Sequence, residues 1–117
     1  MKLLILDPDE YYHQQFARVL SDDFEMFSAK DSGGAKKLLA EKIPDVVVSE
    51  LLLEDGPSFS LISALRSSGK TMPVIVFSQI ANLEDIQETL GMGVSGYFVK
   101  GRDTVSDVHQ LLLTLNS

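Results

Sequence analysis

Residues 44–50 read Pro44-Asp45-Val46-Val47-Val48-Ser49-Glu50, and this stretch decides the fold. Val46–Val48 is a short run of β-branched apolar residues that follows a proline and ends at a serine and an acid. A run of this kind is typical of a strand that is buried on both faces of a parallel sheet. The polar residues directly after it then lie at the carboxyl end of that strand.

Four similar runs lie along the chain, and segments of helix length separate them. These segments carry apolar residues at helical spacing, such as Phe16 and Leu20 in the first and Ile86 and Leu90 in the fourth. Strict alternation of strands and helices predicts one α/β domain over residues 1–117, with a flavodoxin-like five-stranded parallel sheet in the order 2-1-3-4-5 and helices on both faces. The expected strands are Leu3–Leu6, a weaker Glu25–Ser28, Val46–Val48, Val74–Phe77 and Tyr97–Val99.

The composition is that of a soluble globular domain. Hydrophobic residues make up 44% and charged residues 23%, and no apolar stretch approaches the roughly 18 residues of a membrane span. The apolar run near Met1 is too short for a signal peptide, and the absence of cysteine fits a reducing compartment while it excludes thiolate chemistry. We therefore expect a cytoplasmic protein without a membrane partner.

The charge balance argues against a nucleic-acid ligand. Seventeen acids against ten bases give a net charge of −7, which repels phosphate backbones. Lys36-Lys37 is the one basic cluster in the sequence. We expect neither direct nucleic-acid binding nor a small-molecule substrate.

Chemically active side chains follow four of the five expected strands. Asp7 follows the first strand, Ser49 and Glu50 the third, Ser78 the fourth and Lys100 the fifth. Because ligands of open α/β sheets bind outside the carboxyl ends of the strands, these side chains are expected to meet at one rim. Two carboxylates, a hydroxyl and an ammonium could there handle a divalent metal and phosphate oxygens.

With these residues in place, the chain resembles a response-regulator receiver domain over nearly its full length. The resemblance implies a module of two-component phosphorelay signalling, without a catalytic residue of its own and not an enzyme. In that family an aspartate at the end of the third strand accepts a phosphoryl group from a histidine kinase, and Glu50 stands at this position here. A degenerate receiver, or pseudo-receiver, is expected. The matching segments are Leu3–Asp7, Pro44–Glu50, Pro73–Ser78 and Gly93–Lys100.

The resemblance assigns the other site positions as well. Ser78 matches the family's serine or threonine and Lys100 its lysine, which makes them remnants of a phosphate site. The second acid of the family's pair falls at Pro8, unless Asp9 joins Asp7 in the acidic pocket. Gly101 stands where a proline normally follows the lysine.

The implied metal site is expected to be weakened. The family binds Mg²⁺ through acids and a backbone carbonyl, which correspond here to Asp7, Glu50 and the carbonyl of Leu52. With the second acid missing, Mg²⁺ binding is in doubt, and no other cofactor is expected.

Glutamate is a poor substitute for aspartate as a phosphate acceptor. Its extra methylene moves the carboxylate by more than about one ångström, and near-attack geometry tolerates little displacement. We therefore predict no efficient phosphorylation of Glu50. A contact between Glu50 and Lys100 could mimic part of the charge of a phosphoryl group, although one carboxylate brings less charge and fewer oxygens.

Several of these residues could have a purely structural role instead of a role in a phosphate or metal site. Asp7-Pro8-Asp9-Glu10 fits an N-cap, a proline at the first helical position and a capping-box glutamate, with Asp9 and Glu10 as helix-dipole acids. Ser78 could cap a turn, and Lys100 could simply neutralise nearby acids. Other polar residues are expected to lie at the surface in contact with solvent: Glu54, Asp55, His13 and His109.

The resemblance also implies a docking face for a partner, made by residues 82–115. Met92 and Tyr97 are the candidate anchors of this face, and the alternative for Tyr97 is a packing tyrosine. The implied partner is a signalling protein, a histidine kinase or a fused output domain.

Three other functions were weighed. A haloacid-dehalogenase-type phosphatase would use Asp7 as nucleophile and Asp9 as general acid, but no acidic pair follows a late strand to hold its magnesium. A flavodoxin-like cofactor carrier needs a hydroxyl- and glycine-rich phosphate loop after the first strand, where this chain is acidic. A receiver that accepts phosphate on Asp7, Asp9 or Ser49 has only their proximity in its favour.

Overall fold

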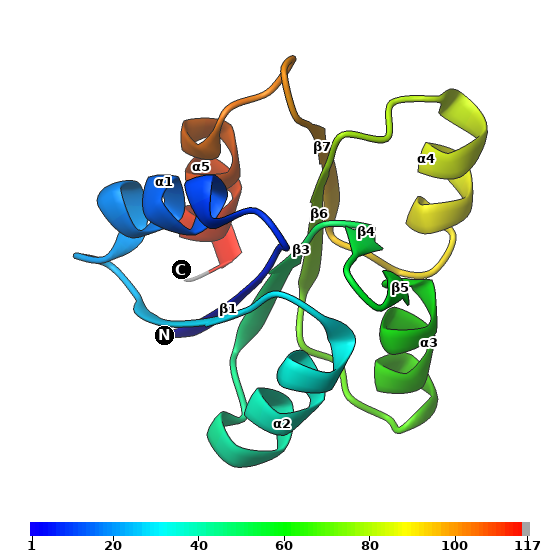
Figure 1. Ribbon diagram of the computed structural model, residues 1–117, viewed down its shortest axis with the longest axis horizontal. Helices are drawn as coiled ribbons and strands as arrows, with labels where there is room; N and C mark the ends of the chain where they lie inside the picture. The colour runs from blue at the N-terminus through cyan, green and yellow to red at the C-terminus, as the bar shows by residue number, and fades with distance from the viewer. Residues whose placement is uncertain (116–117) are drawn as a thin grey trace.

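The computed structural model describes residues 1–115, and the last two residues of the predicted domain, Asn116 and Ser117, lie outside the described residues. The chain forms a central sheet with helices on both faces (Figure 1). Its five strands are β1 (Lys2–Leu6), β2 (Glu25–Ala29), β3 (Val46–Ser49), β6 (Val74–Ser78) and β7 (Gly96–Val99). The helices are α1 (Glu10–Leu20), α2 (Ser32–Lys42), α3 (Phe59–Ser67), α4 (Leu83–Leu90) and α5 (Val105–Leu115).

All pairings in the central sheet are parallel, and the strand order is β2-β1-β3-β6-β7. In chain order of the five strands this is 2-1-3-4-5, so the predicted fold is confirmed. The three inner strands are buried along almost their whole length, as their apolar runs require. The edge strands β2 and β7 are only partly buried, which explains the weaker apolar pattern of residues 25–28.

Each face of the sheet has its own core. Leu3, Ile5 and Phe77 point to the layer of α1 and α5, where they meet Phe16 and Val108. Alternate residues of the same strands point to the layer of α2 and α3. Because every strand ends at the same edge of a parallel sheet, this packing fixes the positions of the residues that follow β1, β3, β6 and β7.

Two features were not predicted. A short antiparallel hairpin, β4 (Leu52–Leu53) and β5 (Gly56–Pro57), follows β3. Helix α4 packs loosely: Thr89 is its buried residue, and Leu90 is 46% exposed. Helix α4 presents Thr89 to the core and turns Leu90 outward, so its apolar spacing does not mark a face that is packed on the core.

None of the helices in residues 1–115 is long and apolar enough to cross a membrane. The cellular compartment stays a prediction.

Candidate functional site

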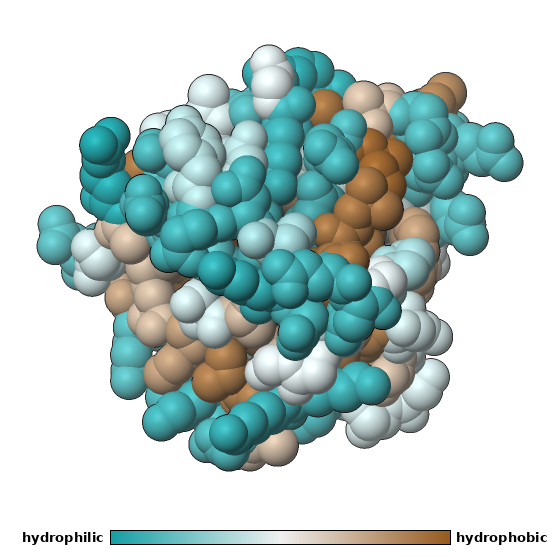
Figure 2. All heavy atoms as spheres, viewed as in Figure 1, coloured by the Kyte–Doolittle hydropathy of each residue, from teal (hydrophilic) through white to brown (hydrophobic). Residues whose placement is uncertain are grey.

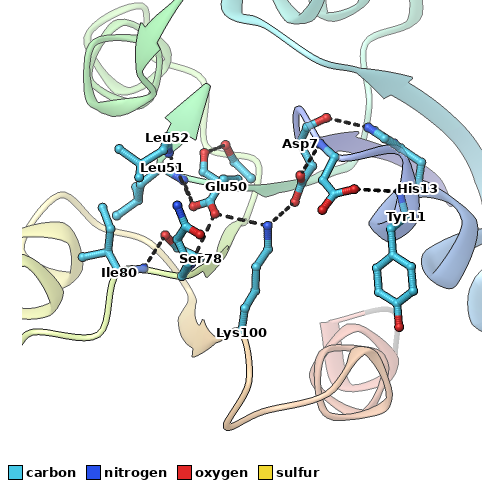
Figure 3. A network of polar contacts seen from close by, with 12 residues as sticks. Asp7, Tyr11, His13, Glu50, Leu51, Leu52, Ser78, Ile80 and Lys100 are labelled. Atoms are coloured by element: carbon cyan, nitrogen blue, oxygen red, sulfur yellow. Dashed lines mark hydrogen bonds and ion pairs between the residues drawn. The ribbon is translucent and has the colours of Figure 1, made fainter. Parts of the chain in front are cut away.

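The residues that follow β1, β3, β6 and β7 meet at one rim of the sheet (Figure 3). They border a depression of about 520 Å³, which is lined by Asp7, Glu50 and Lys100 together with Pro8, Asp9, Tyr12, Leu52, Gln79 and Gly101. The expected convergence of these side chains is therefore present. Ser78 lies one residue before Gln79, with its side chain fully buried.

The ammonium group of Lys100 lies between two buried carboxylates. Its Nζ is 2.7 Å from Oδ2 of Asp7 and 3.1 Å from Oε1 of Glu50, and both acidic side chains are 3% exposed. The same Nζ lies 4.1 Å from the centre of the Tyr12 ring, within the range of a cation–π contact. Lys100 is thus the cation that compensates both acids.

Main-chain donors surround the rest of the Glu50 carboxylate. Oε2 accepts hydrogen bonds from the backbone N–H groups of Leu51 at 2.6 Å and Leu52 at 3.4 Å. Oε1 accepts from the N–H of Gln79 at 3.2 Å, in addition to Lys100. One side chain thereby joins the segment after β3, the loop after β6 and the end of β7.

The loop between β6 and α4 has two further anchors. Oγ of Ser78 accepts a hydrogen bond from the N–H of Ile80 at 3.1 Å. The hydroxyl of Tyr97 donates to the carbonyl of Ile80 at 2.7 Å. The Tyr97 hydroxyl therefore points toward this loop, and both Tyr97 and Met92 are partly buried against the core layer of α2 and α3.

Burial and pairing shift the protonation equilibria of the charged pair. Burial raises the pKa of Asp7 above 3.8, against the opposing effect of its hydrogen bond with Lys100. Burial alone would lower the pKa of Lys100, but the hydrogen bonds and negative charges of Asp7 and Glu50 outweigh it and raise this pKa above 10.5. The lysine is therefore firmly cationic at neutral pH.

The donor set does not fit a divalent cation. Asp7 and Glu50 face the same ammonium, and the remaining Glu50 oxygen is occupied by backbone donors. Pro8 offers no carboxylate. In residues 1–115 no group of three His, Cys, Asp or Glu side chains is arranged to hold a metal, and the carbonyl of Leu52 alone cannot replace the missing acids.

Asp9, and not Asp7, caps helix α1. Its side chain accepts from the N–H of Tyr11 at 2.9 Å, and the helix begins at Glu10. Asp7 is 2% exposed and accepts from the N–H of Asp9 through the oxygen that does not face Lys100. The alternative interpretation of Asp7 as the N-cap was therefore wrong, because its burial beside Lys100 shifts the start of the helix.

The two histidines were wrongly expected at the surface. Both are partly buried. His13 donates from Nε2 to the backbone carbonyl of Asp7 at 2.7 Å, and its Nδ1 is buried without a partner among the described residues. His109 lies 2.9 Å from a carboxylate oxygen of Asp23. The hydrogen bond from His13 thus holds the backbone of Asp7 in place at the end of β1.

Asp55 is not merely solvated. Its carboxylate accepts from the N–H groups of Ser32 at 2.9 Å and Gly33 at 3.2 Å, at the start of α2. These bonds lower the pKa of Asp55 below 3.8. Two adjacent acids in a glycine-proline loop gave no sign of this role, because the capped helix begins 23 residues earlier in the chain.

Comparisons with known proteins agree on one family. Residues 3–111 match the model of the response regulator receiver domain. The virulence transcriptional regulatory protein PhoP of Salmonella typhimurium is 29% identical over 101 residues, which cover 86% of this chain but only 45% of that protein. This chain thus spans about half the length of that relative.

Solved receiver structures have the same fold. The BeF3-activated N-terminal receiver domain of Klebsiella pneumoniae RstA superposes on this chain with a TM-score of 0.87 at 20% identity. The superposition covers 100% of both chains. The chemotaxis response regulator CheY4 of Vibrio cholerae gives a TM-score of 0.85 at 23% identity over 97% of both chains. At these identities the likeness concerns the fold alone.

Proposed function

The chain belongs to the response regulator receiver domain family, and on this premise we propose that it is a receiver that has lost phosphate chemistry at Glu50 and acts by docking to a protein partner. The proposal concerns a non-enzymatic signalling module. The family match leaves the haloacid-dehalogenase hypothesis without support.

The surroundings of the Glu50 carboxylate carry this proposal. A phosphate acceptor needs a carboxylate oxygen that is free to attack phosphorus, with a bound metal to neutralise the incoming charge. Both Glu50 oxygens are instead hydrogen-bonded, and the side chain is 3% exposed. Asp7 and Glu50 already have the ammonium of Lys100 at bonding distance, 2.7 Å and 3.1 Å away.

The same contacts support a permanently organised receiver. Glu50 holds Gln79 at the start of the β6–α4 loop, and Tyr97 holds Ile80 in the same loop. A fixed carboxylate thus keeps these segments together without a phosphoryl group. A partner would then meet one arrangement of the face of residues 82–115, with Met92 and Tyr97 contributing from its partly buried centre.

The partner we propose is a signalling protein, a histidine kinase or an output domain fused to the same polypeptide. Since the chain spans less than half of a relative named as a transcriptional regulator, a fused output domain is one natural arrangement. The receiver itself offers no support for nucleic-acid binding, because its net charge is −7.

Intact mass spectrometry tests the loss of phosphate chemistry. The wild-type chain, Glu50→Asp and Glu50→Asp/Pro8→Asp are incubated with Mg²⁺ and a small acyl-phosphate donor, beside an ordinary receiver domain as reaction control. We expect no phosphoryl adduct on the wild type, little on Glu50→Asp, and the largest gain on the double variant, which restores both the acceptor and the second acid. A stable adduct on the wild type would overturn the proposal and return the protein to the phosphorelay.

A further inference from the structure

An apolar groove lies between α2 and α3, on the opposite face of the sheet from α1 and α5. It has a volume of about 360 Å³, and its floor is formed by Leu39, Leu61 and Leu65. Lys36 and Lys70 line the groove as well, and none of its lining residues is acidic. Neither lysine makes an ion pair with any residue between 1 and 115.

The groove is a basic region of an acidic protein. Residues 32–42 and 58–72, which include α2 and α3, contain five of the ten Lys and Arg residues but only one of the seventeen Asp and Glu residues. The sequence shows Lys36-Lys37 as an isolated pair, and the fold adds Lys70 to it. Such a groove favours an occupant that is both apolar and negatively charged.

Helix α4 of this same chain has those properties. Leu83 is 68% exposed and Leu90 46%, and with the partly buried Ile86 they occupy positions i, i+3 and i+7. The helix contains Glu84, Asp85 and Glu88 and no Lys or Arg. In the space-filling view, hydrophobic atoms reach the surface beside strongly hydrophilic ones at the corner where Figure 1 shows α4 (Figure 2).

We propose that this chain associates with itself head to tail, with α4 of one copy lying in the α2–α3 groove of the next. Leu83 and Leu90 then pack on the apolar floor, and Glu84 and Glu88 lie near Lys36 and Lys70. An amphipathic helix in an apolar groove, read through anchors at i, i+3 and i+7, is an established mode of protein recognition. The inference goes beyond the proposed function and does not depend on the state of Glu50.

The two surfaces differ from one another, so the contact is heterologous. Each copy has one α4 and one groove, and it can therefore bind two neighbours at once, which leads to rings or open chains and not to a closed two-fold dimer. One eight-residue helix is about 12 Å long. It buries less area than a standard stable interface of about 1,600 Å², so the association is expected to be weak, near the micromolar-to-millimolar range.

Sedimentation equilibrium from low to near-millimolar protein tests the proposal. The mean mass of the wild type is expected to rise with concentration beyond that of a dimer. The rise should shrink when the salt is increased from about 0.1 M to about 1 M, where the Debye length falls from about 10 Å to about 3 Å. A wild type that stays monomeric over this range would overturn the proposal.

Two variants separate the surfaces. Lys36→Glu/Lys70→Glu disables the groove, and Leu83→Ser/Leu90→Ser disables α4; each alone should remain monomeric. An equimolar mixture should form a one-to-one dimer and nothing larger, because one groove and one α4 are still intact. Arg18→Glu/Lys30→Glu, which makes the same charge change at exposed positions outside residues 32–42 and 58–72, should associate like the wild type.

The mixture also distinguishes this contact from others. If either single-surface variant still associates, or if the mixture forms no dimer, the contact is not between α4 and the groove and the proposal is wrong. Far-UV circular dichroism of every variant confirms that a loss of association is not a loss of fold. The phosphorylation assay is independent of these results, so failure of one proposal leaves the other standing.

Discussion

Replacing Lys100 by methionine removes the cation that two buried acids share. Nζ lies 2.7 Å from Asp7 and 3.1 Å from Glu50, and both carboxylates are 3% exposed. Methionine keeps most of the length and apolar contact of the lysine side chain, including its packing near Tyr12. The change therefore tests charge compensation more than packing.

The expected cost follows from the geometry. At an effective dielectric of 20 the two ion pairs have raw attractions of about 6 and about 5 kcal/mol, most of which offsets the desolvation of the three ions. Without the lysine the acids keep their desolvation penalty, and breaking a buried pair in this way costs about 3–5 kcal/mol. Protonation of one buried acid limits this loss of stability, because the folded state can take up a proton when the penalty of the charge becomes larger. Protonating a carboxylate whose ordinary pKa is 3.8 costs about 4 kcal/mol at pH 7.

The cost must then depend on pH. In the variant, the folded-state pKa of Asp7 rises further above its unfolded value, so the folded state binds more protons and stability falls as pH rises above about 4. Neutralising one carboxyl costs only about 1.6 kcal/mol at pH 5, so the loss should be smaller there than at pH 7 by roughly 2–3 kcal/mol. The wild type should show a smaller difference, because the hydrogen bond and charge of Lys100 oppose the rise in its Asp7 pKa.

Urea denaturation followed by far-UV circular dichroism at pH 7 and pH 5 measures both quantities. Lys70→Met is the matched control, because that lysine is exposed and makes no ion pair with the described residues. The variant Asp7→Asn/Glu50→Gln/Lys100→Met should recover much of the lost stability, since neutral replacements of a whole buried ion cluster are often tolerated. If Lys100→Met costs no more than Lys70→Met at pH 7, the reasoning about the two buried acids is refuted.

Three further changes probe the contacts around this centre. Glu50→Gln replaces an acceptor oxygen by an amide donor facing backbone N–H groups, and should lower the free energy of unfolding by about 1–3 kcal/mol in urea denaturation. Tyr97→Phe removes the hydrogen bond to Ile80, and should cost about 0.5–1.5 kcal/mol and speed amide exchange in residues 79–82. The lowered pKa of Asp55 contributes stability above about pH 3.8 that is lost as the pH falls, so thermal melts of Asp55→Asn should show lower stability at pH 5 and a shallower decline below pH 4 than the wild type.

The sheet could be predicted because burial leaves a simple mark on sequence. Strands covered on both faces are apolar at nearly every position, as Val46–Val48 of β3 is, and the intervals between them have the length and spacing of helices. The direction of the apolar face of helix α4 could not be predicted in this way. Its apolar residues at positions 86 and 90 have helical spacing, but spacing cannot tell whether the stripe faces this chain's own core or the solvent.

Part of the site was also accessible from sequence. The end of a parallel strand has a fixed place, so Asp7, Glu50 and Lys100 could be expected at one rim without coordinates. Hydrogen bonds to the backbone could not, because the N–H of Gln79 has no side-chain signature. The N-cap of Asp9 and the bonds from Asp55 to the start of α2 depend on the exact paths of the loops, which composition does not determine.

A single ammonium, that of Lys100, compensates both acids of the site. Two acids and a cation at bonding distance already compensate one another, and neither Pro8 nor the backbone-bonded Glu50 oxygen adds a free carboxylate oxygen for a divalent ion. The same pairing orients Glu50 toward Gln79 and so fixes the loop that leads into α4. Helix α4, which follows this loop, has Thr89 as its buried residue. The proposed loss of phosphate chemistry and the anchoring of the β6–α4 loop thus rest on the same arrangement of charges.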